Sequence, residues 1–255
     1  MNRMATIYLF DVDGTLTPPK NNVDPRFAKQ FLKWMKEKEV YIVSGGSFVR
    51  ILDQLGGKIV NHTAGIFACM GNIFYEQIDQ INREGFDEWR IVYENSFKAP
   101  PGLYKDLDLI VHNSPYEIKT GKHYERRTGM VNFSVVGRNA DPSQRADYAA
   151  YDAQEHEREH IVEQLKEKYD KLDFVIGGAV SIDIFNVGND KSQVIERHFE
   201  EALRSNRIVF VGDRIPFPGN DYSLATALLQ SSNGEVYEVE SWQDTAELLK
   251  TEAFA

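Results

Sequence analysis

The feature that most constrains the fold is a short apolar run, residues 5–10 (ATIYLF), that leads directly into two aspartates in Asp11-Val12-Asp13-Gly14-Thr15. A short apolar segment bounded by Asp and Gly is typical of a buried strand. Alternation along an extended chain places Asp11 and Asp13 on one side, so two carboxylates share one space. Like charges that close need a compensating cation, and Mg²⁺ prefers oxygen ligands.

This pair of carboxylates suits chemistry at phosphorus. One can attack as a nucleophile while the other moves a proton. Gly14 permits the sharp turn that points backbone N–H groups at a phosphate. The alternative is a surface Asp-Gly turn without chemistry. The apolar strand before the motif and Thr-Leu-Thr after it favour the catalytic interpretation.

The elements on either side of the middle region alternate between strand and helix. A helix over residues 24–38 is followed by a strand at 40–43 and a helix that ends at Leu55, before Gly56-Gly57. After Lys191 the alternation resumes, with a helix over 193–203, strands at 207–211 and near 236–239, and a helix over 242–251. Such alternation implies a parallel sheet with crossover helices.

The middle region has a different pattern. We expect a helix over residues 86–97, a long charged helix over 142–169, and strands at 107–112, 124–127, 130–136, 174–176 and 180–185. These elements indicate an antiparallel sheet that carries two helices. The sequence therefore predicts an α/β core, residues 1–82 and 187–255, interrupted by an α+β insert at 83–186.

Composition narrows the classes of function. The chain has 255 residues, 42% of them hydrophobic, which is enough for a sizeable core. A net charge of −10 argues against general binding of nucleic acid. No run approaches the ~20 apolar residues of a membrane span. The single cysteine, Cys69, excludes a disulfide framework. A cytoplasmic protein without membrane or nucleic-acid partners is the expectation.

Further polar motifs stand where chemistry at phosphorus would need them. Ser44-Gly45-Gly46-Ser47 ends the second strand and precedes a helix, so its hydroxyls and amides can hold a phosphoryl group. Lys191 begins a later helix and could neutralise a transition state. Asp213 directly follows the apolar strand IVFVG, and Asp221 comes eight residues later. In open α/β sheets, ligands bind at the carboxyl ends of the strands.

In these motifs the chain resembles the haloacid dehalogenase (HAD) superfamily of phosphotransferases. LFDVDGTLTPP, GGS, RTGMVNFSVVGR, GGAVSIDIFNVGNDK and GDRIPFPGNDY are more closely similar to the eukaryotic-type phosphomannomutases. The motifs of the insert are the discriminating ones, because the core motifs occur throughout the superfamily. The fold implied is a HAD-like Rossmannoid core with an inserted cap.

The resemblance implies a role for each matching residue. Asp11 would be the phosphorylated nucleophile, Asp13 the general acid/base, and Lys191 a ligand of the transferring phosphate. Mg²⁺ would be held by Asp11, Asp213 and the backbone carbonyl of Asp13. The following residues would bind substrate: Lys20, Ser47, Arg127, Arg138, Arg145, Ser181 and Asp183. Arginine suits such a task, because its planar fork of donors matches a phosphate.

The chain also departs from the family pattern. Lys20 stands where the family usually has Arg, which keeps the charge and loses the bidentate fork. Phe48 replaces an acidic residue after the serine of the second motif, and either Ser44 or Ser47 could face the phosphate. After Asp221 the chain continues as YSLATALLQ, where the family often binds a structural cation.

The resulting hypothesis is a mutase that interconverts mannose 6-phosphate and mannose 1-phosphate and supplies GDP-mannose synthesis. Its partners would be a hexose phosphate, a hexose 1,6-bisphosphate activator and a second copy bound through the cap. A HAD-type sugar-phosphate phosphatase would use the same core and admit water. A non-catalytic sugar-phosphate-binding protein would need no nucleophile, so the retention of Asp11 argues against it.

Two motifs have plainer explanations. His156-Glu157-Arg158-Glu159-His160 matches the H-E-x-x-H pattern of zinc proteases, but the sequence around it is charged on nearly every side. We interpret it as a solvated helix with i,i+4 ion pairs. Cys69 lies in an apolar stretch, which favours a buried small hydrophobe over a nucleophile.

Overall fold

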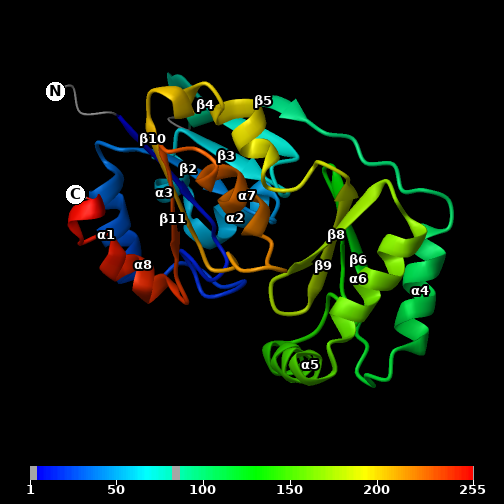
Figure 1. Ribbon diagram of the computed structural model, residues 1–255. Helices are drawn as coiled ribbons and strands as arrows, with labels where there is room; N and C mark the ends of the chain where they lie inside the picture. The colour runs from blue at the N-terminus through cyan, green and yellow to red at the C-terminus, as the bar shows by residue number, and fades with distance from the viewer. Residues whose placement is uncertain (1–4, 82–86, 255) are drawn as a thin grey trace.

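The computed structural model describes residues 5–81 and 87–254, and its larger lobe is built on a seven-stranded sheet (Figure 1). The strand order is β11-β10-β1-β2-β3-β4-β5. The first five of these strands pair in parallel, while β4 and β5 extend the sheet antiparallel. The bounds are β1 (Thr6–Phe10), β2 (Glu39–Val43), β3 (Gly65–Ala68), β4 (Ile73–Ile81), β5 (Asp87–Glu94), β10 (Arg207–Gly212) and β11 (Gly234–Glu238).

Helices cover both faces of this sheet, as the parallel pattern requires. Tyr8 and Phe10 of β1 pack into the cluster that includes α1 and α8, whereas Ile7 and Leu9 pack into the opposite cluster. The helices are α1 (Pro25–Met35), α2 (Phe48–Leu55), α3 (Gly57–Val60), α7 (Tyr222–Leu229) and α8 (Trp242–Leu248), with a π-helix (Ile195–Phe199) and 3₁₀ turns (Ala202–Arg204, Glu252–Phe254). The expected α/β core is confirmed.

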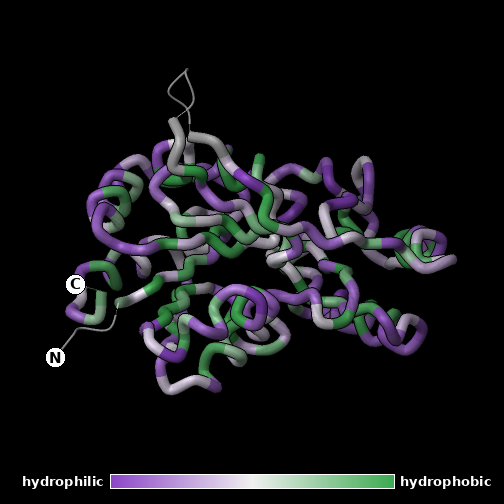
Figure 2. The backbone as a smooth tube through the Cα atoms, turned by 90° about the horizontal axis from the view of Figure 1, so that it is seen from above, coloured by the Kyte–Doolittle hydropathy of each residue, from purple (hydrophilic) through white to green (hydrophobic). Residues whose placement is uncertain are grey.

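A smaller lobe lies beside the core and has its own sheet, in the order β6-β7-β9-β8 (Figure 1). All pairings in it are antiparallel. Its elements are β6 (Tyr124–Arg127), β7 (Met130–Phe133), β8 (Leu172–Gly177), β9 (Ser181–Asn186), α4 (Leu103–Asn113), α5 (Pro142–Glu155) and α6 (Glu157–Lys168). Figure 2 shows hydrophobic stretches along the interior strands and hydrophilic ones in the outer helices and loops. We call this lobe the cap.

The helix expected at residues 86–97 is wrong, because residues 87–94 form strand β5. β5 pairs antiparallel with β4 and so belongs to the core sheet. Its Trp89, Ile91, Val92 and Tyr93 are residue types that favour strands, and pairing with β4 overrode the helical spacing. The predicted domain boundaries stay a prediction. The first of them falls on residues 82–86, outside those the structure describes.

The strand expected at residues 107–112 is also wrong, because these residues lie in helix α4. The short length of the apolar run LDLIVH suggests a strand. Leu103, Leu107, Ile110 and Val111 are the buried residues of α4, however, and their spacing is that of one helix face. Gly102, with φ +90°, lies immediately before the helix.

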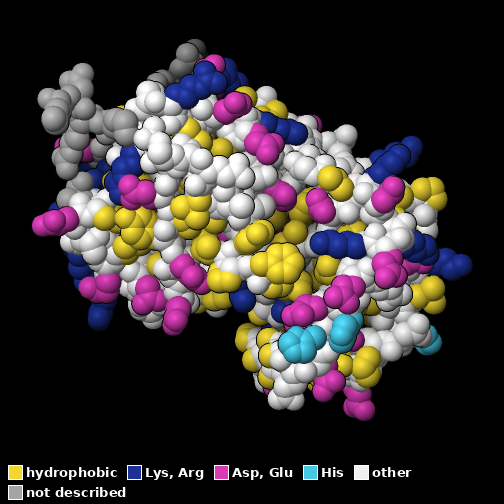
Figure 3. Space-filling view, viewed as in Figure 1, with side chains coloured by type: hydrophobic (Ala, Val, Ile, Leu, Met, Phe, Trp, Pro, Cys, Tyr) yellow, Lys and Arg dark blue, Asp and Glu magenta, His cyan; other side chains and the backbone are white. Residues whose placement is uncertain are grey.

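The long charged helix expected over residues 142–169 is broken in two at His156, which has a left-handed backbone (φ 53°). The side chain of Asp152 accepts a hydrogen bond from the Arg158 N–H (2.8 Å) and so stabilises the break. His156 therefore does not share a helical face with His160, and the zinc pattern is not formed. Histidines are visible on the exposed surface of this lobe in Figure 3.

Candidate active site

Three polar segments meet at one edge of the core sheet, where the adjacent parallel strands β10, β1 and β2 end. Asp213 follows β10, Asp11 follows β1 and Ser44 follows β2. The Asp11 N–H continues the ladder by donating to the Val211 carbonyl (3.0 Å), which fixes where the chain leaves the sheet. The sequence predicted this meeting point because carboxyl ends of parallel strands share an edge.

Lys191 lies beneath this edge and is completely buried. Its Nζ donates to Asp11 Oδ1 (2.7 Å) and to Asp221 Oδ1 (2.5 Å). Burial alone would lower the pKa of Lys191, but the carboxylates of Asp11 and Asp221 outweigh it and raise the pKa above its usual value. The ammonium therefore remains charged, and it tethers the proposed nucleophile.

Three carboxylates surround the single positive charge of Lys191, so the group as a whole is negatively charged. Oxygens of Asp11, Asp213 and Asp221 lie within 4.8 Å of one another. Burial raises the pKa of Asp11 well above its usual value, and burial together with Asp221 raises the pKa of Asp213 to about 7. Crowded, desolvated carboxylates of this kind are oxygen ligands that fit a divalent cation. The sequence had named Asp11 and Asp213; Asp221 joins them.

Gly14 lets Asp213 lie close to the loop that follows β1 and carries Asp11 and Asp13. Its φ is +89°, and a Cβ placed there would lie 2.3 Å from Asp213 Oδ2. Any side chain at this position would therefore push the metal-ligand candidate away from Asp11. The glycine of the DVDGT motif is needed for this contact as well as for the turn.

Asp13, the second aspartate of the motif, is half-buried and held in place through one oxygen. Its Oδ1 accepts hydrogen bonds from the backbone N–H of Lys20 (2.5 Å) and from Nε2 of Gln54 (2.9 Å). Within the described residues, Oδ2 has no hydrogen-bond donor. A carboxylate with one fixed and one free oxygen can exchange a proton with a bound substrate.

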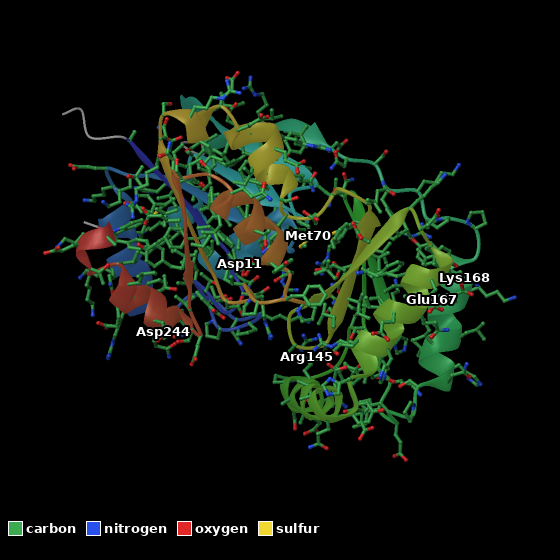
Figure 4. The ribbon with its side chains drawn as sticks, in the orientation of Figure 1. Asp11, Met70, Arg145, Glu167, Lys168 and Asp244 are labelled. Atoms are coloured by element: carbon green, nitrogen blue, oxygen red, sulfur yellow. The ribbon has the colours of Figure 1, made fainter. Side chains whose placement is uncertain are left out.

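A cavity between the two lobes opens above these groups, and nine of the predicted site residues line it. They are Asp11, Asp13, Lys20, Arg127, Arg138, Arg145, Ser181, Asp183 and Asp213. Figure 4 shows Asp11 in the core and Arg145 in the cap, at α5, facing the gap between the lobes. The cavity thus has a carboxylate end in the core and a cationic side formed largely by the cap.

Arg127 and Arg138 are organised by a carboxylate that the sequence analysis missed. Glu125 Oε2 accepts from Arg127 (2.9 Å) and also from Arg138. Arg127 further donates to the Gly45 carbonyl of the core (2.8 Å), so this cap residue bridges the lobes. Among the residues that the structure describes, its buried Nε has no hydrogen-bond partner. Glu125 alternates with Arg127 along β6, and this spacing was the available signal.

Lys20, Arg50 and Arg145 form the less neutralised part of the cationic side. No ion pair involves any of them in the part of the chain that the structure describes. Burial and the neighbouring Arg145 and Arg138 lower the pKa of Lys20 to about 7. Burial and Arg138 lower the pKa of Arg145 to about 10. The positive charges in this cluster repel one another, and a bound anion would offset that repulsion.

Arg50 is a lining residue that sequence reasoning did not single out. It lies in the first turns of α2, directly after the Ser44–Ser47 loop. Of the two serines left open, Ser44 lines the cavity and Ser47 does not. Ser44 Oγ accepts from the Gly46 N–H (3.0 Å), while Ser47 is the N-cap of α2.

Asp183 lies in the cavity wall next to the cationic side and is buried. Its Oδ1 accepts from the Asn132 amide (2.6 Å), and Asn132 in turn accepts from Arg138 (2.5 Å). Burial raises the pKa of Asp183, and Arg127 opposes that shift. A Cβ at Gly177 would lie 2.6 Å from Asp183 Oδ2, so the absence of a side chain there leaves room for the carboxylate.

Cys69 is buried, as expected for a structural residue, and it has no disulfide partner. Burial raises the pKa of its thiol to about 11. At neutral pH the residue is therefore protonated and a poor nucleophile. Its backbone N–H supports the site instead, because it donates to the Gly46 carbonyl (2.8 Å).

Solved structures show the class of fold to which this chain belongs. A haloacid dehalogenase-like hydrolase from Bacteroides thetaiotaomicron matches with a TM-score of 0.55 and 14% identity, covering 97% of this chain and 99% of the other. The N-terminally truncated, IMP-bound IMP-nucleotidase of Plasmodium falciparum matches with a TM-score of 0.60 and 14% identity, over 98% of this chain and 68% of the other. The chain has the HAD-like fold.

Sequence comparison then identifies the family. The family model described as eukaryotic phosphomannomutase matches residues 28–254. Phosphomannomutase 1 of Dictyostelium discoideum is 33% identical over 226 residues, covering 86% of each chain. The phosphomannomutase of Dendrobium officinale is 32% identical, over 96% of this chain and 92% of its own. The chain belongs to the eukaryotic phosphomannomutase family and is an isomerase of that kind.

Proposed function

We propose that the enzyme interconverts mannose 6-phosphate and mannose 1-phosphate through a phosphorylated Asp11 and a hexose 1,6-bisphosphate. The observation that carries this mechanism is the two-ended cavity. One end holds Asp11 and Asp13, and a cationic side opposite holds Arg127, Arg138 and Arg145. A sugar that spans the cavity can present one phosphate to the cations and its other end to the carboxylates.

Phosphoryl transfer would proceed in two balanced halves. Phospho-Asp11 gives its phosphoryl group to the free hydroxyl of a hexose monophosphate, and the Asp11 oxygen–phosphorus bond breaks as the hydroxyl oxygen–phosphorus bond forms. Asp13 takes the hydroxyl proton. The bisphosphate then turns over and returns the other phosphoryl group to Asp11, while Asp13 gives the proton to the departing sugar oxygen. Lys191 keeps Asp11 placed throughout, and a hexose bisphosphate activator supplies the first phosphoryl group.

Mg²⁺ is the proposed cofactor, held by Asp11, Asp213 and the backbone carbonyl of Asp13. When bound, it would neutralise charge on the transferring phosphoryl group. Asp221 has both oxygens engaged, by Lys191 and by the Arg214 N–H (3.1 Å). We therefore assign Asp221 to orienting Lys191, and we leave Asp11 and Asp213 as the carboxylate ligands.

Water must be kept from phospho-Asp11, since hydrolysis would make the enzyme a phosphatase. Two contacts support a closed arrangement of the lobes. Arg127 of the cap reaches the Gly45 carbonyl of the core, and β8 of the cap forms a backbone bridge from Ile176 to Gly219 of the core. Both contacts border the loops that line the cavity.

The proposed mechanism is tested by incubating the enzyme with mannose 1-phosphate, Mg²⁺ and a trace of glucose 1,6-bisphosphate. Mannose 6-phosphate and free phosphate are followed together, with Asp11→Asn as the blank. Isomerisation with little free phosphate, abolished in the blank, is the expected result. Free phosphate without isomerisation would show the phosphatase instead. Glucose 1-phosphate in a parallel assay measures the preference at C2 of the sugar.

We further propose a cytoplasmic homodimer that associates through the cap and contributes to GDP-mannose supply. Among the helices of residues 5–81 and 87–254, none is long and apolar enough to cross a membrane. β6 forms one edge of the cap sheet, and we place the contact between the two copies at this edge. Light scattering of the purified protein tests the dimer; a monomer at micromolar concentration would contradict it.

A further inference from the structure

Gln54 is a buried amide that the reaction scheme above does not use. It lies in the last turn of α2 and is only 5% exposed. Its Nε2 donates to Asp13 Oδ1 at 2.9 Å, with longer contacts to Thr17 Oγ1 (3.2 Å) and the Asn21 carbonyl (3.4 Å). A buried amide that reaches the proposed general acid/base can control how that carboxylate is presented.

The orientation of this amide is determined by chemistry. Arg50, one turn earlier on the same face of α2, donates from Nε to Gln54 Oε1 (3.2 Å). A guanidinium can only donate, so the oxygen of the amide must face Arg50. The NH₂ group therefore faces Asp13, which as a carboxylate can only accept. Exchanging the two ends of the amide would set donor against donor and acceptor against acceptor.

The two oxygens of Asp13 consequently have different surroundings. Oδ1 receives both the Gln54 amide and the Lys20 backbone N–H (2.5 Å). Both donors use the accepting lone pairs of Oδ1. A proton on Oδ1 would therefore displace one of these hydrogen bonds, so Oδ1 is the less favourable oxygen to protonate. Oδ2 has no donor within the described residues, so it is the oxygen left to meet the substrate hydroxyl.

We propose that Gln54, oriented by Arg50, is a positioning residue that holds Asp13 by Oδ1 and so reserves Oδ2 for proton transfer. This inference rests on the proposed function of Asp13. In the step that phosphorylates Asp11, the proton on Oδ2 passes to the sugar oxygen as its bond to phosphorus breaks. Asp13 is left as a carboxylate whose Oδ1 keeps both hydrogen bonds. In the reverse transfer, Oδ2 takes the proton from the attacking hydroxyl.

The test compares Gln54→Met, which keeps the length of the side chain and removes its donor, with the wild-type enzyme. With mannose 1-phosphate we expect kcat to fall about 10- to 100-fold while KM changes less than about threefold, because positioning of an acid/base acts on the transition state. With p-nitrophenyl phosphate, whose leaving group needs no proton, the rate of Asp11 phosphorylation should change little. Equal losses with both substrates would overturn the proposal.

A double-mutant cycle separates positioning from general damage. If Gln54 acts through Asp13, then adding Gln54→Met to Asp13→Asn should have almost no further effect on kcat. A further loss as large as in the wild-type background would contradict the inference. Thr17→Val is the matched control, because it removes another partner of the same amide without touching the Asp13 side chain. It should retain the wild-type ratio of the two substrates.

The outcome can be told apart from failure of the proposed function. If the wild-type enzyme released phosphate without isomerising the sugar, the mutase mechanism would be wrong. Asp13 would still serve as the acid for the departing sugar oxygen, so the same variants and the same two substrates would be compared by free phosphate. Loss confined to the sugar phosphate would then still support the role of Gln54.

Discussion

We predict that Lys20 makes the binding of the sugar phosphate dependent on pH, in a range that is easily measured. Its pKa is about 7, because it is largely buried and lies near Arg145 and Arg138. The ammonium is therefore present below pH 7 and is lost as the pH rises through that value. A charged hydrogen bond to a phosphate contributes about 1.5–3 kcal/mol, so the neutral amine should bind substrate about 10- to 100-fold less tightly.

The pKa of Lys20 and the weaker binding by its neutral form together set the size of the pH effect on kcat/KM. About three quarters of Lys20 is protonated at pH 6.5 and about 3% at pH 8.5 if its pKa is 7. Weighting the two forms by their binding gives a fall in kcat/KM of about 6- to 20-fold between these values. kcat should fall less, because a bound phosphate stabilises the ammonium and moves its titration to higher pH.

Lys20→Arg is the variant that isolates this titration. Arginine keeps its charge throughout the range, so kcat/KM of the variant should vary less than about twofold between pH 6.5 and 8.5. The assay is the mutase rate at low mannose 1-phosphate and saturating Mg²⁺, so that Asp213 stays ionised. The ratio of wild type to variant at each pH cancels the titration of the substrate phosphate. Parallel profiles for the two enzymes would refute the assignment to Lys20.

Three further predictions follow from single contacts. Gly177→Ala should raise KM for the sugar phosphate several-fold with little change in melting temperature, because its Cβ would meet Asp183 Oδ2 at 2.6 Å on the surface of the cavity; an unchanged KM would contradict this. Tyr148→Phe should destabilise the enzyme by about 1–3 kcal/mol in urea unfolding, because buried Glu157 loses a donor at 2.8 Å. Asp213→Asn should raise the Mg²⁺ concentration needed for half-maximal activity at least about tenfold, as measured by titration of the chelated enzyme; an unshifted curve would exclude Asp213 as a ligand.

The acidic and cationic parts of the site differ in how far sequence reasoning could reach. Asp11, Asp13 and Asp213 each follow an apolar strand, so a local pattern located them and the parallel sheet brought them together. The cationic side was named only through family resemblance, since a lone arginine carries no local signal. Its pairing with Glu125 emerges from the strand register of the cap.

The two elements that the sequence misassigned show the same limit. β5 and α4 are both short segments rich in apolar residues, which periodicity alone does not separate. β5 became a strand because β4 offered an antiparallel partner. α4 became a helix because the cap sheet offered a surface for one face of it, where Leu107 and Ile110 are buried. The deciding contacts came from other parts of the chain.

The sequence by itself determined the class of fold and the positions of the proposed nucleophile and its acidic neighbours, because these depend on a strand followed directly by polar residues. Only the tertiary structure decided which serine faces the cavity, that Arg50 joins the cations, and that Gln54 holds Asp13 by one oxygen. The physical reason is range. A strand end is a local property, whereas hydrogen-bond partners and desolvation depend on which distant segments the packed core brings within a few ångströms.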